Sequence, residues 1–241
     1  MLCTRPIEMI KQLLSFIYPK LCFACERELR GDETQVCLHC QEDIPVYGKD
    51  QDKSQSNSNT VFQLFWGKSN VQYATSCFEY VKGEKLQRLI HELKYKGQRN
   101  LAKYFGEIMA NEITNNHHFS CVDAICFVPS SKQKTRTRGY NQAEELAKTI
   151  SKLTEIPTLD ILAKRKETTS QTDKNVHDRH FNLQKSFALK KSKGSPTKQH
   201  QHVLLVDDVI TTGATLNACA NVLLTNSNVR VSVLTLAYRN I

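Results

Sequence analysis

The strongest constraint on the fold lies in one stretch near the C-terminus, residues 203–215, which reads Val-Leu-Leu-Val-Asp-Asp-Val-Ile-Thr-Thr-Gly-Ala-Thr. Its four leading aliphatic residues predict a short buried strand, since the run is too short for a helix and is typical of a parallel sheet. The acidic pair Asp207 and Asp208 follows at the C-terminal end of that strand, and residues 216–224 have helical spacing. The stretch therefore predicts an α/β unit made of a strand, an acidic pair, a small-residue turn and a helix.

The turn is built from small and hydroxyl-bearing residues, namely Thr211, Thr212, Gly213, Ala214 and Thr215. At a helix start, the N–H groups and hydroxyls of such a turn converge on one point, where the helix dipole favours an anion. Gly213 permits a positive φ or a close backbone approach. The carboxylates of Asp207 and Asp208 would repel a phosphate and suit the vicinal hydroxyls of a ribose, directly or through Mg²⁺. These features predict a site for phosphoribosyl pyrophosphate or a nucleotide. The alternative is an ordinary turn in which Asp208 or Thr211 caps the helix.

The order of strand, acidic pair and Thr-Thr-Gly-x-Thr resembles the phosphoribosyl-pyrophosphate-binding loop of type I phosphoribosyltransferases. The resemblance implies a mostly parallel sheet flanked by helices and a catalytic role for Asp207 and Asp208, with Mg²⁺ accompanying the phosphoribosyl pyrophosphate. The chain has no Gly-x-x-x-x-Gly-Lys-[Ser/Thr] segment, so no motif suggests hydrolysis of a nucleoside triphosphate.

Four cysteines near the N-terminus are spaced as two metal-binding knuckles, Cys22-x-x-Cys25 and Cys37-x-x-Cys40. Two such pairs can surround one tetrahedral ion, and four protein ligands close its coordination, so we predict a structural Zn²⁺. The neighbouring residues are too few to build a core, and the metal would supply folding free energy. The alternative, two redox-active Cys-x-x-Cys pairs, requires a thioredoxin-like βαβ context that is absent here. Nine cysteines in all argue against a full disulfide framework and favour a reducing, cytoplasmic location.

The polar stretch at residues 49–60 has no aliphatic or aromatic side chain and predicts a flexible linker. It separates a predicted module at residues 1–48, holding an N-terminal helix and the zinc site, from a phosphoribosyltransferase-like domain at residues 61–241. Residues 1–60 carry seven Lys and Arg against nine Asp and Glu, and the remainder carries 26 against 15. The positive field therefore belongs to the second domain.

No apolar run approaches the roughly 20 residues that a membrane span needs. Near the N-terminus, Ile7, Ile10, Leu14 and Ile17 share one helical face and predict a short amphipathic helix. A signal peptide is the rival interpretation, but the apolar segment is short and charged residues flank it on both sides.

A basic segment follows the predicted buried strand at residues 121–129. Ligands bind beyond the C-terminal ends of strands in open α/β sheets, and Arg can hold pyrophosphate oxygens bidentately. We therefore predict a pyrophosphate-binding loop, with a solvated surface loop as the alternative, that comprises Ser130, Ser131, Lys132, Arg136, Arg138 and Gly139.

Residues 159–187 begin with a strand and continue as a polar segment. We predict a mobile flap that closes over an anionic ligand, or else a surface loop, and its candidate ligand-binding residues are Arg165, Lys166, Gln171 and Arg179. Helical spacing of apolar residues also predicts helices around residues 86–97, 101–113 and 141–153, the first of which ends at Gly97. β-Branched residues at alternate positions predict a last strand at residues 230–238. His91 on the first helix is a catalytic candidate, although a lone helical His is usually structural.

Several segments together resemble the ComF family of competence-related, phosphoribosyltransferase-like proteins, over almost the whole chain. The matching segments are the N-terminal Leu-Leu-x-Phe-x-Tyr-Pro-x-x-Cys-x-x-Cys, Leu-Ile-His-x-Leu-Lys-Tyr-Lys-Gly at 89–97, Arg-Gly-Tyr-Asn-Gln at 138–142, and Thr168, Gln171, Thr172, Arg179, Asn182 and Phe187. The chain departs from the family at Ser130-Ser131, where Val-Pro-Leu is usual. The resemblance implies a cytoplasmic protein that helps incoming single-stranded DNA through uptake or processing.

Three function classes follow from these patterns. In the first, a DNA-handling protein uses the sugar-phosphate site for binding or regulation, while cations track a phosphate backbone and Tyr95, Tyr140 and Phe181 stack bases. In the second, an active transferase passes the phosphoribosyl group to an acceptor and releases pyrophosphate, although the sequence shows no evident base for a nucleobase acceptor. In the third, a zinc-bearing adaptor docks to a helicase-like competence partner.

Overall fold

A five-stranded parallel sheet forms the centre of the computed structural model, which describes residues 19–48, 59–95, 97–165, 186–190, 200–226 and 228–240. The strands are β1 (Tyr73–Glu79), β2 (Ala124–Phe127), β3 (Thr158–Leu159), β6 (His202–Ile210) and β7 (Arg230–Tyr238), in the spatial order β1-β7-β6-β2-β3. Every neighbouring pair runs parallel. The predicted mostly parallel sheet is confirmed, and the last strand has the expected bounds.

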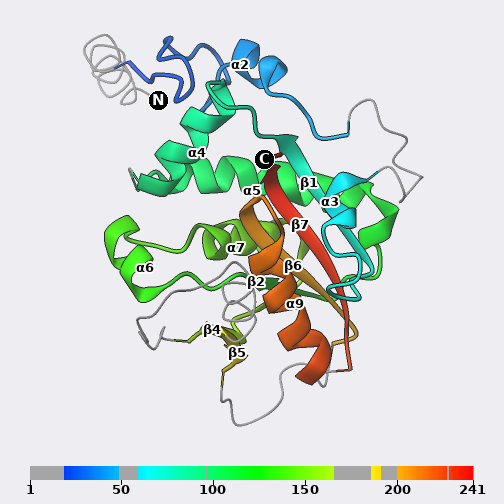
Figure 1. Cartoon of the computed structure of the whole chain (residues 1–241). Coiled ribbons are helices and arrows are strands. Elements are labelled where there is room, and N and C mark those ends of the chain that lie inside the picture. The colour runs from blue at the N-terminus through cyan, green and yellow to red at the C-terminus, as the bar shows by residue number, and fades with distance from the viewer. Residues whose placement is uncertain are drawn as a thin grey trace, which may run out of the picture.

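Helices cover both faces of the sheet (Figure 1). Alternate residues of β6 enter two separate hydrophobic clusters, because successive side chains of a strand point to opposite faces. Leu204 and Val206 join the cluster that includes α4 (Lys85–Tyr95), α5 (Arg99–Asn115) and α7 (Gln142–Thr154). Val203 and Leu205 join the cluster that includes α3 (Thr60–Gln63) and α9 (Ala214–Asn226). The remaining elements are α2 (Leu38–Asp43), the 3₁₀ turn η2 (His117–Phe119), α6 (Lys132–Arg138), and the antiparallel pair β4 (Leu162–Lys164) and β5 (Phe187–Leu189).

The central strand is longer than the sequence suggests, since β6 continues through the acidic pair to Ile210. Its two neighbours differ in length. The ladder to β2 stops at Phe127 opposite Val206, whereas the ladder to β7 continues to Tyr238. Asp207 and Asp208 therefore lie within a strand on the β7 side and beyond the sheet on the β2 side, which leaves them at the C-terminal edge as expected.

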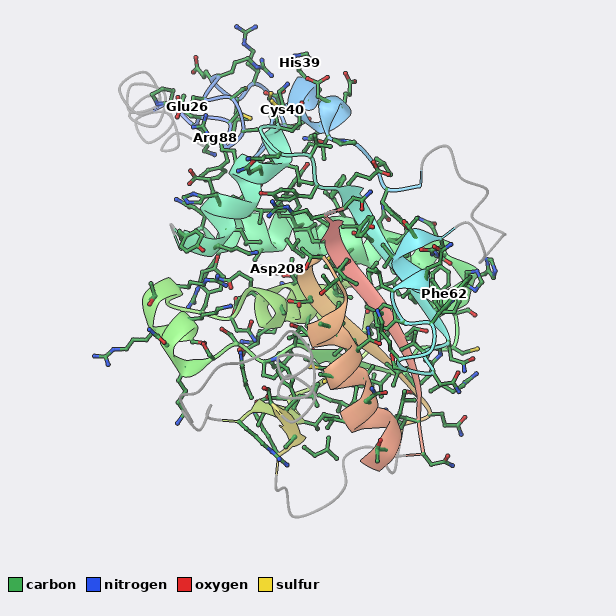
Figure 2. All side chains as sticks on the ribbon, viewed as in Figure 1. Glu26, His39, Cys40, Phe62, Arg88 and Asp208 are labelled. Carbon is green, nitrogen blue, oxygen red and sulfur yellow. The ribbon has the colours of Figure 1, made fainter. Side chains whose placement is uncertain are left out.

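The four-cysteine segment packs against the body of the protein. Cys22, Cys37 and Cys40 belong to the same hydrophobic cluster as the buried face of α4. Two ion pairs fasten this contact, from Glu26 to Arg88 and from Asp43 to Lys85 (Figure 2). The segment therefore rests on α4.

Four predicted features lie outside the described residues: the N-terminal amphipathic helix, most of the linker, the flap residues Lys166, Gln171 and Arg179, and the base-stacking residue Phe181. The described residues on either side of the linker contact each other. The Tyr47 hydroxyl binds Asn59 Oδ1 at 3.0 Å and accepts a hydrogen bond from the Val61 amide at 2.9 Å. Among the helices that the model describes, none combines the length and apolar character required to cross a bilayer.

Candidate functional site

The acidic pair lies in a cleft of about 250 Å³ at the C-terminal edge of the sheet. Strand β6 contributes Asp207, Asp208 and Val209, and helix α9 contributes Thr215. Further side chains reach it from four other segments of the chain, and they include Lys94, Ser130, Ser131, Lys134, Arg138, Asn141 and Lys164. The cleft thus combines two carboxylates with four cations, so its lining favours an anionic ligand that also carries hydroxyl groups.

Asp208 is largely buried and is neutralised from helix α4. Lys94 Nζ lies 3.1 Å from Asp208 Oδ2, and the Asp208 carboxylate also accepts a hydrogen bond from the Val209 amide at 2.6 Å. A buried carboxylate is stable only when it is paired and hydrogen-bonded. Lys94 therefore holds the charge of Asp208 inside the cleft.

Asp207 has a different environment. The pKa of Asp207 is raised to about 8, mainly because its carboxyl is buried at the floor of the cleft. The nearby charge of Asp208 raises this pKa further. The Asp208 amide, Lys94 and Lys134 act in the opposite direction. A ligand that brings positive charge or hydrogen-bond donors would favour ionisation of Asp207.

The Thr-Thr-Gly-Ala-Thr turn lies at the surface where β6 meets α9, and Gly213 is required there for two reasons. Its φ is +72°, and a Cβ at this position would meet Leu64 Cβ and Asn217 Nδ2, each at 3.2 Å. Asn217 fastens the turn, because its side-chain amide donates to Gly213 O at 3.0 Å and to Leu64 O at 3.1 Å. Sequence analysis did not single out Asn217, although its position one helical turn after Gly213 is the available signal.

The basic segment after β2 is a short helix, which corrects the predicted loop. Helix α6 begins after Ser131, whose hydroxyl accepts from the Lys134 amide at 3.3 Å, and it ends at Gly139 with a φ of +81°. This arrangement changes which cations face the cleft. Ser130, Ser131, Lys134 and Arg138 line it, Lys132 lines an adjoining cavity, and Arg136 lies exposed outside the cleft.

The Arg-Gly-Tyr-Asn-Gln motif connects the basic helix to its surroundings. The Arg138 guanidinium lies 5.3 Å from the centre of the Tyr95 ring and donates to Gln142 Oε1 at 3.0 Å. Tyr140 is buried and donates to Leu93 O of α4 at 2.5 Å, so the prediction that Tyr140 stacks on bases is wrong. Asn141 donates to Val128 O at 3.0 Å. The motif therefore positions α6 relative to α4 and β2.

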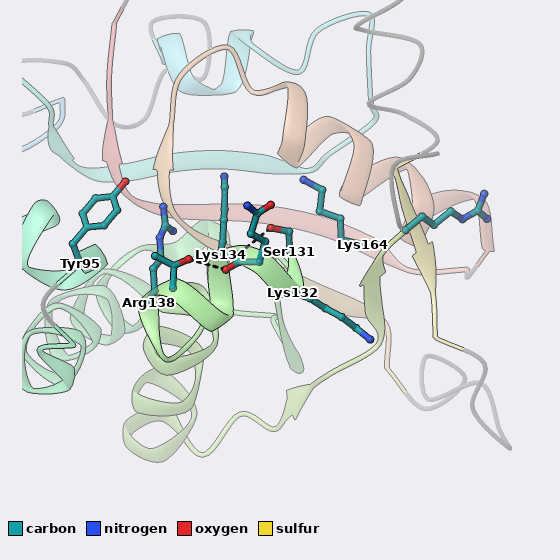
Figure 3. Close-up of a pocket in the computed structure, with 9 residues that line it drawn as sticks. Tyr95, Ser131, Lys132, Lys134, Arg138 and Lys164 are labelled. Atoms are coloured by element: carbon teal, nitrogen blue, oxygen red, sulfur yellow. Dashed lines mark hydrogen bonds between the residues drawn. The ribbon is translucent and has the colours of Figure 1, made fainter. Parts of the chain in front are cut away.

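A larger basic cavity of about 800 Å³ adjoins the cleft, and they share Ser131, Lys134, Arg138 and Lys164. Among the described residues, its cations are Lys132, Lys134, Arg138, Lys164 and Arg165, and none of the described lining residues is acidic. Figure 3 shows Lys134 of α6, Lys164 of β4 and Tyr95 of α4 extending toward the same side, while Lys132 points away from them. Tyr95 is 55% exposed. The predicted flap residue Arg165 lies here, and its amide donates to Ser186 O at 2.7 Å, which brings the two ends of the predicted flap together beside the cavity.

The four cysteines form one cluster whose sulfurs all lie within 4.8 Å of one another. A tetrahedral ion with bonds of about 2.3 Å needs sulfurs roughly 3.8 Å apart, and Cys25 Sγ lies 3.7 Å from Cys37 Sγ. Burial has the largest single effect on the pKa of the Cys37 thiol and raises it. Hydrogen bonds, the largest of them from the Arg27 side chain and the Cys40 amide, together outweigh burial, so the pKa is lowered to about 6. The geometry and the donor set fit a metal ion held by thiolates.

Comparison with known proteins yields a family match and several relatives. The phosphoribosyl transferase domain family matches residues 136–241. Competence protein F of Haemophilus influenzae is 31% identical over 209 residues, which cover 84% of this chain and 83% of that protein. Competence protein ComFC of Streptococcus pneumoniae is 26% identical, with coverages of 78% and 81%. The DNA utilization protein YhgH of Escherichia coli O157:H7 is 28% identical, with coverages of 61% and 65%. Among solved structures, an adenine phosphoribosyltransferase from Leishmania tarentolae aligns with 11% identity and a TM-score of 0.37, covering 76% of this chain and 89% of that one.

The raised pKa of Asp207 yields a prediction for stability. Since it lies above the ordinary value of 3.8, the folded protein binds the extra proton between about pH 4 and pH 8, and the free energy of unfolding falls as the pH rises through that range. We expect Asp207→Asn to raise the free energy of unfolding by at least about 1 kcal/mol at pH 8 and to change it little at pH 4. Denaturant unfolding at the two pH values measures this effect. The exposed Asp32→Asn serves as the control, and an Asp207→Asn variant with the pH dependence of the unsubstituted protein would contradict the interpretation.

Proposed function

The chain belongs to the ComF family of competence proteins, with a phosphoribosyltransferase domain, and from this premise we propose that it binds a phosphoribosyl pyrophosphate-like sugar phosphate together with single-stranded DNA. The observation that carries the proposal is the cleft itself. Two adjacent carboxylates lie at its floor, cations form its wall, and the glycine turn lies at its edge.

Each part of phosphoribosyl pyrophosphate has a matching group in this cleft. The 5′-phosphate would lie on the amides and hydroxyls of residues 211–215, because the first N–H groups of a helix have no partner within it. The ribose hydroxyls would bind Asp207 and Asp208. The pyrophosphate would lie against Ser131, Lys134 and Arg138, whose guanidinium can hold two oxygens at once. When bound, Mg²⁺ would neutralise pyrophosphate oxygens, and carboxylates are among its preferred ligands.

The experiment that tests this site is calorimetric titration of phosphoribosyl pyrophosphate with Mg²⁺. The variant carrying both Asp207→Asn and Asp208→Asn is expected to lose at least about tenfold in affinity, because the hydroxyl acceptors lose their charge. Asp160→Asn, an exposed acidic position outside the cleft, is the matched control. Unchanged affinity in the double variant would refute the assignment. Pyrophosphate release on addition of nucleobases would identify an active transferase.

For the cysteine cluster, we propose structural zinc, since four thiolates complete a tetrahedral coordination. The purified protein is expected to carry about one zinc per chain. Cys22→Ser should lower this content and destabilise the contact with α4, whereas the exposed cysteine variant Cys121→Ser should leave it unchanged. Metal analysis with equal zinc in both variants would contradict the proposal. Thiols held in this way also favour a cytoplasmic location.

Single-stranded DNA is proposed to follow the basic cavity, where five of the described lining residues are cations and Tyr95 offers an exposed ring for base stacking. Counterion release makes such binding salt-dependent. The logarithm of the binding constant falls linearly with the logarithm of the salt concentration, with a slope of about 0.7 for each phosphate neutralised on a single strand.

Lys134→Ala combined with Arg138→Ala is expected to weaken binding of a labelled oligonucleotide and to reduce this slope by about 1.4, because two phosphate contacts are lost. Fluorescence anisotropy across a salt series provides the measurement. Lys103→Ala with Lys152→Ala removes the same charge from exposed positions outside the cavity, and an equal change in both double variants would exclude a localised DNA path.

An adaptor role toward a helicase-like competence partner draws support from the four-cysteine segment. Three of its aliphatic side chains are exposed, namely Leu21 at 46%, Leu38 at 63% and Val46 at 45%. These exposed side chains are accessible to a protein partner.

A further inference from the structure

A third cavity of about 640 Å³ lies beside the cleft and has no role in the function proposed above. It shares Lys94 and Val209 with the cleft, and it shares Tyr95 with the basic cavity. Thr211, the first residue of the phosphate turn, lines it, while Thr215 at the other end of that turn lines the cleft. The turn therefore adjoins both spaces, and the three cavities are neighbours that share wall residues.

The lining of this third cavity suits a planar heteroaromatic ring. The Arg239 guanidinium lies over the Tyr80 ring, 5.4 Å from the ring centre, and the centres of the His91 and Tyr95 rings are 4.8 Å apart. Gln87 accepts a hydrogen bond from the Gly83 amide at 2.7 Å through Oε1, which directs its NH₂ group to other partners. Flat faces for stacking, together with an amide for the ring edge, are the features by which proteins hold unstacked nucleobases.

The free donors of the phosphate turn favour a terminal phosphate over one within a strand. Leu64 and Asn217 hold Gly213 in place, because they pack so closely on it that a Cβ would meet them at 3.2 Å. A phosphodiester within a strand offers the donors of the turn only two non-bridging oxygens and one negative charge. A phosphomonoester presents three oxygens and nearly two negative charges at pH 7, which match the converging donors of a helix start.

We propose that these three neighbouring cavities together bind the 5′-phosphorylated end of a single DNA strand. The terminal phosphate lies on residues 211–215, the first base lies in the cavity of Tyr80 and Arg239, and the following phosphates run along the basic cavity. This inference rests on the proposed function, since it uses the same phosphate turn. The basic cavity distinguishes a strand from a free mononucleotide, because its five cations exceed what one phosphate requires.

The test compares 3′-labelled oligonucleotides of one sequence that carry either a 5′-phosphate or a 5′-hydroxyl, by fluorescence anisotropy with the full chain. The phosphorylated strand is expected to bind at least about tenfold more tightly. Phosphoribosyl pyrophosphate should remove that advantage, and because its pyrophosphate uses Lys134 and Arg138 it should also weaken binding of the 5′-hydroxyl strand. Deoxyadenosine monophosphate should compete far more weakly than an unlabelled phosphorylated strand.

Tyr80→Leu keeps an apolar side chain but removes the ring, and it is expected to lower the affinity for the phosphorylated strand about tenfold. Trp66→Leu alters an exposed aromatic residue outside the three cavities and should retain that affinity. Equal affinity for the two strand ends would overturn the proposal, as would competition by the mononucleotide at the same concentration as the strand. A protein that binds phosphoribosyl pyrophosphate without preferring either end would refute this inference and leave the proposed function standing. An end preference without phosphoribosyl pyrophosphate binding would refute the proposed sugar-phosphate ligand instead.

Discussion

Two adjacent carboxylates at the end of a buried strand impose the main physical constraint on this molecule. Ionised carboxylates are costly to remove from water unless cations and hydrogen-bond donors surround them. Strand β6 donates hydrogen bonds to the two carboxyls from the Asp208 and Val209 amides, but it supplies no Lys or Arg. The cations come from elsewhere: Lys94 contacts Asp208 from α4, and the positive charge of Lys134 on α6 acts on Asp207. The architecture around the sheet therefore holds these two helices in place.

Helix α4 positions one of these cations and connects the four-cysteine segment to the cleft. At its first turns, Lys85 and Arg88 bind the acidic residues of the four-cysteine segment, and its buried leucines pack on the cysteines themselves. At its last turn, the Leu93 carbonyl receives Tyr140 and Lys94 reaches Asp208. Packed interiors transmit displacement because they contain few voids. The cysteine cluster thus supports the wall of a cleft to which it contributes no residue.

The spacing of apolar residues in the sequence predicted the helices and strands that bury an apolar face. It did not predict helix α6, which buries no side chain. Strand β7 and helices α4, α5 and α7 all show the expected periodicity. Helix α6 buries no residue, so no apolar repeat marks it, and only the cap at Ser131 and the turn at Gly139 define it. Likewise, the acidic pair and the glycine turn could be found from sequence, whereas the participation of Lys94 and Lys164 depends on tertiary packing. Tyr140 shows the same limit, because a tyrosine in a basic segment gives no sign that tertiary contacts will bury it.

The charge balance of the cleft also bears on the two ligands proposed for it, which differ in length. Its own carboxylates consume part of the positive charge, since Lys94 is already paired with Asp208. Lys134, Arg138 and Lys164 form the wall shared with the basic cavity, so a short anion and a long one meet the same cations first. A ribose with two vicinal hydroxyls would engage both carboxylates, whereas deoxyribose lacks one of the hydroxyls and would rely more on phosphate and base contacts. The floor of the cleft therefore favours the small sugar phosphate and its outer wall favours the strand, so the two ligands would compete at the shared cations.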